Sequence, residues 1–75
     1  MEGTQAVSRW FIHRRQEFIA ATFKQFGQIR RSDIIREFDV SLQQASNDIS
    51  LFMETEPPHV RYDVSAKCYI LEDEA

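Results

Sequence analysis

Residues 32–54, SDIIREFDVSLQQASNDISLFME, decide the fold of this chain. Ser41 and Gln44, three residues apart, are expected to form a capping box, in which each side chain bonds a free N–H group at the start of a helix. The apolar residues that follow recur at helical spacing and predict a helix over residues 42–54. Its inward stripe is expected to comprise Ala45, Ile49, Phe52 and Met53.

A shorter helix is expected just before it, over residues 33–38. Ser32 is the expected N-cap, and Asp33 suits the positive end of a helix. Only Asp39-Val40 form the turn between the two helices, and aspartate is among the residues that tolerate left-handed backbone. Two helices joined by so short a turn, the second strongly capped, form a helix-turn-helix.

The flanking segments complete the domain. The spacing of phenylalanine and isoleucine predicts a helix over residues 8–26, which Gly27 ends with the positive φ that glycine allows. Residues 28–30 are expected to form a one-bridge strand. Strands over residues 59–62 and 67–71, with a turn at 63–66, predict a β-hairpin after Pro57-Pro58 has stopped the preceding helix.

The expected fold is therefore mainly α with a small β-hairpin. It is a winged helix-turn-helix of three helices plus a two- or three-stranded wing, in one domain over residues 1–75. The recognition helix is about 42–54 and the wing about 59–71, and residues 1–5 and 72–75 are expected to fray.

Composition excludes several classes of protein. With 43% apolar and 28% charged residues, the chain is globular rather than disordered. A single cysteine allows no internal disulfide, and His13 and His59 lack zinc spacing, so we expect no metal and no cofactor. No phosphate loop or nucleophile arrangement points to an enzyme. The apolar runs are too short for a membrane span and no secretory signal is present, so we expect a cytoplasmic protein.

The formal net charge of −3 conceals an uneven distribution. Residues 1–36 contain seven basic and three acidic side chains, whereas residues 37–75 contain two basic and nine acidic ones. Binding depends on the local field, so a positive surface is compatible with the acidic total.

Residues 34–49 resemble the helix-turn-helix of bacterial repressors. The longer stretch 27–71 is more specifically similar to the N-terminal winged domain of WYL-domain regulators, with DeoR-type regulators as looser relatives. The resemblance is carried by residues 29–34, 40–49 and 60–70. It implies a repressor of transcription that binds double-stranded DNA as a homodimer, with the recognition helix in the major groove. Those regulators continue into an effector-sensing domain, so this chain is either a fragment of such a regulator or a standalone one.

The candidate base-reading residues lie on the outer, N-terminal face of the recognition helix, because that part of such a helix touches base edges. They are Gln43, Gln44, Ser46 and Asn47. Glutamine and asparagine can bond adenine through two atoms. The alternative is a solvated polar face with Gln44 used in the cap. Asp48 would be repelled by phosphate, so we expect it to pair with an arginine of this domain or to lie away from the groove.

Candidate phosphate contacts flank this helix on both sides. They are Arg30, Arg31, Ser41, Arg61 and Lys67. Guanidinium groups and helix N-termini both bind phosphate well. The alternatives are that Arg30 and Arg31 pair with Asp33 or Glu37, and that the wing charges only discourage edge pairing. Arg9, Arg14 and Arg15 are either a solvated face or contacts to flanking DNA backbone.

Trp10, Phe11 and Ile12 exceed what one small core needs. They either cover the domain's own core or form a dimer contact, as a two-fold DNA site would require. An alternative function is a winged-helix protein-interaction module without DNA binding, which would dock through these three residues. A third is an acidic mimic of DNA, which the basic first half of the chain disfavours.

Overall fold

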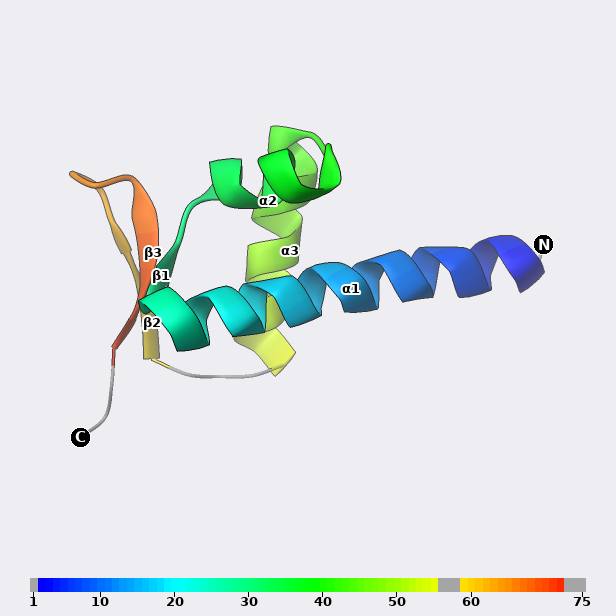
Figure 1. Cartoon of the computed structure of the whole chain (residues 1–75), viewed down its shortest axis with the longest axis horizontal. Coiled ribbons are helices and arrows are strands. Elements are labelled where there is room, and N and C mark those ends of the chain that lie inside the picture. Colours follow the sequence, from blue (N-terminus) through cyan, green and yellow to red (C-terminus); the bar gives the residue numbers. More distant parts are fainter. Residues whose placement is uncertain (1, 56–58, 73–75) are drawn as a thin grey trace.

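The computed structural model describes residues 2–55 and 59–72, and these contain three helices and a three-stranded sheet. Figure 1 shows α1 (Glu2–Phe26) running along the longest axis, with the other elements gathered around its C-terminal half. The expected fold class, mainly α with a small β-wing, is confirmed. The predicted stop at Pro57-Pro58 and the predicted fraying of residues 73–75 lie outside the described residues. The predicted fraying of Glu72 is wrong, because Glu72 ends β3 and pairs with His59.

The first helix begins at Glu2 rather than near residue 8, so most of the lead that we expected to fray is helical. Gln5 and Ala6 are good helix formers, and no proline interrupts residues 2–8. The other end is as predicted, because Gly27 has φ +76° and its N–H donates to the Phe23 carbonyl at 2.8 Å. The Gly27 carbonyl also accepts from the Leu71 N–H at 2.9 Å, which joins the end of α1 to the sheet.

The helix-turn-helix consists of α2 (Arg31–Phe38) and α3 (Leu42–Thr55). Asp39 adopts the predicted left-handed backbone, with φ 56° and ψ 47°, and its N–H donates to the Ile35 carbonyl at 2.7 Å. The prediction that Ser32 caps α2 is wrong, since Arg30 is the N-cap residue. The Asp33 carboxylate accepts the Arg30 backbone N–H at 2.9 Å, so it satisfies the donor at this helix start.

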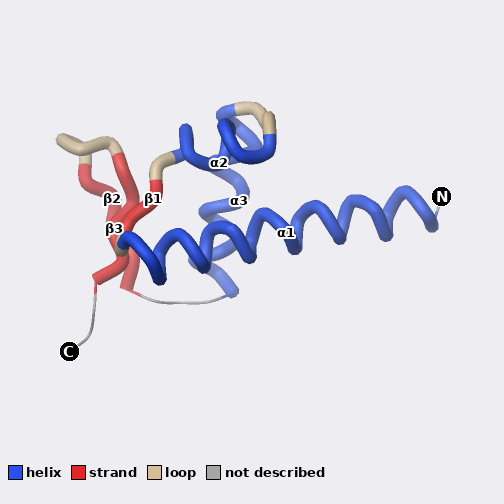
Figure 2. Tube along the Cα trace, in the orientation of Figure 1, coloured by secondary structure: helices blue, strands red, loops and turns tan. Residues whose placement is uncertain are grey.

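The wing is an antiparallel sheet with strand order β1-β3-β2. Figure 2 shows its strands beside the C-terminal end of α1. The strands are β1 (Gln28–Ile29), β2 (His59–Asp63) and β3 (Cys68–Glu72). Asp63 pairs with Cys68, and Lys67 lies in the turn with φ 56°, so the prediction that Lys67 opens the second strand is wrong. The Asp63 carboxylate accepts the Ala66 N–H at 3.0 Å, which moves the turn one residue along the chain.

The core lies where α1, α3 and β1 meet, with one residue from α2. Its buried members are Ile19, Phe23, Ile29, Ile34, Ala45, Ile49 and Phe52. The predicted inward stripe of α3 is confirmed, with Met53 partly buried against this cluster. The predicted apolar face of the first helix is only partly internal, because Phe11, Ile12 and Phe26 are exposed. The N-terminal half of α1 extends past the other elements (Figure 1), and Trp10, like Phe11 and Ile12, is exposed there.

Candidate nucleic-acid interface

The third helix has one buried and one exposed face along its N-terminal half. Ala45 and Ile49 are fully buried, whereas Gln43, Asn47 and Ser50 are exposed. The start of the helix is fixed as predicted, because the Ser41 hydroxyl oxygen accepts the Gln44 N–H at 3.0 Å. The exposed polar residues therefore stand on a rigid, capped helix.

Two of the four candidate base-reading residues are fully on the outer face. Gln43 donates through Nε2 to Asn47 Oδ1 at 3.1 Å, one turn apart on the same side of the helix. Their remaining amide atoms face solvent. Such a pair offers both donors and acceptors to an approaching ligand.

The other two candidates, Gln44 and Ser46, are half-buried and lie on either side of this outer stripe. Gln44 Nε2 donates to Asp48 Oδ1 at 3.0 Å, so its side chain does not return to Ser41 as a complete capping box would require. On the opposite side, the Ser46 hydroxyl accepts from Arg31 Nη1 at 3.4 Å. The four residues share one end of α3, and two of them are held by charged neighbours.

Arg31 lies at the junction of α2, α3 and the wing. Besides its bond to Ser46, its guanidinium carbon is 5.9 Å from the centre of the Tyr62 ring. Tyr62 packs against Tyr69 across the hairpin, with ring centres 4.8 Å apart. The alternative that Arg31 pairs with Asp33 or Glu37 is wrong, because these contacts hold it between the recognition helix and the wing.

Arg30 is exposed beside Arg31, and within residues 9–54 and 59–72 its guanidinium has no carboxylate partner. The nearby Asp33 is occupied instead by the Arg30 backbone N–H and by Arg36 Nη2, each at 2.9 Å. A free guanidinium beside the start of α2 is suited to phosphate.

The two basic residues of the wing differ. Arg61 forms an ion pair with Glu72 on the neighbouring strand, so its charge is locally offset. Lys67 is exposed in the turn and pairs with no carboxylate in the described part of the chain. Lys67 is therefore the stronger candidate for a phosphate contact.

A buried ion pair joins α1 to the recognition helix. Arg15, only 9% exposed, donates through Nε to Asp48 Oδ2 at 2.7 Å, and Asp48 is 2% exposed. Gln16 adds a bond to the Asp48 carbonyl at 2.8 Å. The prediction that Asp48 pairs with an arginine is confirmed, but both expectations for Arg15, a solvated residue or a contact to flanking DNA, are wrong. Its place four residues before the buried Ile19 was the signal that sequence reasoning missed.

The apolar residues at the N-terminal half of α1 do not cover the core, so that alternative is wrong. Trp10 is 57% exposed, and its ring contacts only Phe11 and Arg14 among the interactions of the described residues. Phe11 and Ile12 line a shallow hollow of about 340 Å³ together with Arg15 and Gln44. This exposed patch is continuous with one edge of the recognition helix.

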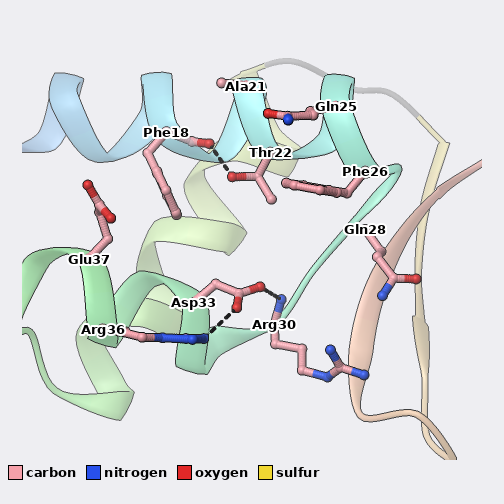
Figure 3. Close-up of a pocket in the computed structure, with 10 residues that line it drawn as sticks. All are labelled: Phe18, Ala21, Thr22, Gln25, Phe26, Gln28, Arg30, Asp33, Arg36 and Glu37. Atoms are coloured by element: carbon pink, nitrogen blue, oxygen red, sulfur yellow. Dashed lines mark hydrogen bonds and ion pairs between the residues drawn. The ribbon is translucent and has the colours of Figure 1, made fainter.

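A second groove, of about 700 Å³, lies between the C-terminal half of α1 and α2 (Figure 3). Phe18, Thr22 and Phe26 point into it from α1, and Asp33 and Arg36 face them from α2. None of the candidate base-reading residues lines it. The groove is thus separate from the outer face of α3.

Within residues 2–55 and 59–72, no three side chains of the metal-binding types cluster in a way that could hold an ion. None of the described helices combines the length and the hydropathy that a membrane crossing requires.

Two helices joined by a tight turn, an exposed polar face on the second and a β-wing after it define a winged helix-turn-helix domain. A family model described as the BrxR transcriptional regulator winged helix-turn-helix domain matches residues 12–74. The chain belongs to this family. The class of domain that the sequence resemblance implied is thereby confirmed.

Individual relatives agree with this assignment. The chain is 39% identical over 62 residues to a protein of Escherichia coli strain KTE188 named DNA-binding transcriptional repressor CapW. Proteins of the same name in Stenotrophomonas maltophilia and Pseudomonas aeruginosa are 35% and 37% identical over 66 and 62 residues. These matches cover 83–88% of the chain but only 21–22% of each relative, so the chain spans about a fifth of their length.

Proposed function

We propose that this chain is the DNA-binding domain of a bacterial transcriptional repressor and reads double-stranded DNA with α3 in the major groove. One observation carries the proposal. The capped start of α3 presents Gln43 and Asn47 outward, flanked by Gln44 and Ser46, in a domain whose relatives are named DNA-binding repressors. The major groove admits one α-helix and displays a distinct donor and acceptor pattern for each base pair.

Phosphate contacts would set the register of the domain on the duplex. Arg30 and Lys67 pair with no carboxylate among the described residues, the Ser41 hydroxyl retains a proton to donate, and Arg31 lies between α3 and the wing. Arg61 would have to exchange Glu72 for phosphate. We place Arg61 last among these contacts for that reason.

The domain would act as a homodimer in the cytoplasm, without enzymatic activity, cofactor or metal. The exposed Trp10, Phe11 and Ile12 supply an apolar contact for a second copy, and two copies would match a two-fold DNA site. A dimer would also stabilise a domain of only 75 residues.

Fluorescence anisotropy tests the proposal with a labelled duplex from upstream of the gene that encodes the chain, scanned across salt. We expect tighter binding than to a scrambled duplex, and binding that weakens steeply as salt rises. Absence of binding at low salt would favour the alternative, a protein-interaction module that docks through the Trp10-Phe11-Ile12 patch.

Replacing Arg31 tests the phosphate contacts separately. Arg31→Ala is expected to weaken binding to all duplexes alike and to lower the slope of log affinity against log salt by about one unit. Arg36→Ala is the matched control, because Arg36 pairs with Asp33 on α2 at 2.9 Å. An unchanged slope for Arg31→Ala would remove this residue from the phosphate contacts.

A further inference from the structure

The hydrogen-bond network behind Gln44 has a direction that chemistry alone fixes. Arginine has only donors and an ionised carboxylate has only acceptors. Arg15 Nε donates to Asp48 Oδ2 at 2.7 Å, and Asp48 Oδ1 is therefore left to accept from Gln44, whose Nε2 lies 3.0 Å away. The amide nitrogen of Gln44 must face Asp48, because its carbonyl oxygen would meet another acceptor there.

The rest of the Gln44 amide is free to meet a ligand. Gln44 is half-buried at the edge of the outer face of α3, and among the described residues its Oε1 atom has no hydrogen-bond partner. Asp48, by contrast, is 2% exposed and uses both carboxylate oxygens and its backbone carbonyl in hydrogen bonds. The network is thus rigid at its buried end and presents a carbonyl oxygen at its exposed end.

The neighbouring amide pair lacks this direction. Gln43 and Asn47 are 3.1 Å apart, but both are amides, so turning both over preserves the hydrogen bond between them. Either residue can present a donor or an acceptor to a base. Only Gln44, among the amide side chains of the outer face, has its polarity fixed by a charged partner.

We propose that Arg15 and Asp48 act as positioning residues that make Gln44 a specificity-determining hydrogen-bond acceptor, which selects an amino base, adenine or cytosine, on the contacted DNA strand. Adenine N6 and cytosine N4 are the amino donors in the major groove, whereas guanine and thymine present acceptors at the equivalent places. This inference rests on the proposed DNA-binding function and adds the chemistry of one contact.

A binding selection from a randomised duplex library, run with the 75-residue chain and its variants, tests the inference. Gln44→Met keeps the length of the side chain and removes the amide, so the one base position whose preference disappears is the position that Gln44 reads. In the unsubstituted chain this position is expected to favour an amino base by about tenfold.

Asp48→Asn then reverses the direction of the network. The asparagine side chain accepts from Arg15 through its carbonyl oxygen and offers its NH₂ group to Gln44, which must turn its own carbonyl inward and its nitrogen toward the groove. The same base position is expected to change from an amino to a keto base, guanine or thymine, by a similar factor. The preference at the position read by Gln43 and Asn47 serves as the internal control and is expected to stay as it was.

The outcomes separate this inference from the proposed function. If the unsubstituted chain enriches no sequence, the proposed function fails. If it enriches one but Gln44→Met changes no position, the inference is overturned while DNA binding stands. It is likewise overturned if a duplex that lacks the exocyclic amino group of the adenine or cytosine at the position found binds as tightly as the complete duplex. If Asp48→Asn folds and keeps the amino preference at the Gln44 position, the inference is also overturned. Circular dichroism establishes folding, and if Asp48→Asn does not fold, binding to the duplex that lacks this amino group decides.

Discussion

The inner and outer faces of α3 meet different demands over the same few residues. On the inner face, Ala45 and Ile49 are fully buried and Asp48 is bonded at every oxygen it has, to α1 and to its own helix. On the outer face, Gln43 and Asn47 share one hydrogen bond and are otherwise exposed to solvent. The inner face fixes where the helix lies, and the outer face is left free to bind.

The comparison teaches that each face should respond to a different measurement. Substitutions on the inner face are expected to change the free energy of unfolding and, at Asp48, also the base preference through Gln44. Substitutions on the outer face are expected to change DNA binding and leave unfolding almost unaltered. Gln44 and Ser41 lie at the boundary, so their substitutions should affect both quantities.

The largest effect is expected when the buried ion pair is broken. Arg15→Ala should lower the free energy of unfolding by about 3–5 kcal/mol, because it leaves the Asp48 carboxylate buried without its charged partner. Urea denaturation followed by circular dichroism measures the change. Arg14→Ala is the matched control on the same helix, since Arg14 is exposed and pairs only with Glu17, and it should cost less than about 0.5 kcal/mol.

A double substitution sharpens this result. Arg15→Met combined with Asp48→Leu removes both charges together and is expected to recover most of the lost stability. If Arg15→Ala proves no more destabilising than Arg14→Ala, the ion pair does not fix α3 against α1.

An intermediate effect is expected on the outer face. Asn47→Ala should weaken binding to the selected DNA site by about 1–3 kcal/mol and binding to random DNA very little, because base contacts supply discrimination. The free energy of unfolding should stay within about 0.5 kcal/mol, since Asn47 is exposed and alanine favours helices. Gln43→Ala is expected to behave alike. An equal loss on both DNAs would exclude Asn47 from base reading.

The sequence predicted the local features of the fold, because their causes lie within a few residues. Gly27 and Asp39 were expected at positive φ for the backbone freedom of their residue types, and both adopt it. The Ser41 cap needs only the N–H of Gln44 and was likewise predicted correctly. In each case a short stretch of chain contains both partners of the interaction.

The sequence did not predict features whose partners are far apart in the chain. Arg15 and Asp48 are 33 residues apart, and periodicity alone could not show that the two helices would cross there. The contact of Arg31 with Ser46 spans 15 residues and depends on how α2 packs on α3. The candidate base-reading residues lie on α3 as predicted, but the polarity of Gln44 depends on the long-range pair of Arg15 and Asp48.

The smallest effect is expected at Ser41, on the boundary between the two faces. Ser41→Ala should lower the free energy of unfolding by about 1 kcal/mol, because the Gln44 N–H loses its acceptor at 3.0 Å. It should also weaken binding to all DNA slightly, since the hydroxyl can no longer donate to phosphate.

Ser41→Asp separates the two roles, because aspartate caps a helix as well as serine does but repels phosphate. Thermal unfolding and anisotropy, measured on both variants, should show Ser41→Asp close to the unsubstituted chain in stability and weaker than Ser41→Ala in DNA binding. Equal DNA binding by the two variants would mean that Ser41 stabilises the start of α3 without facing the duplex.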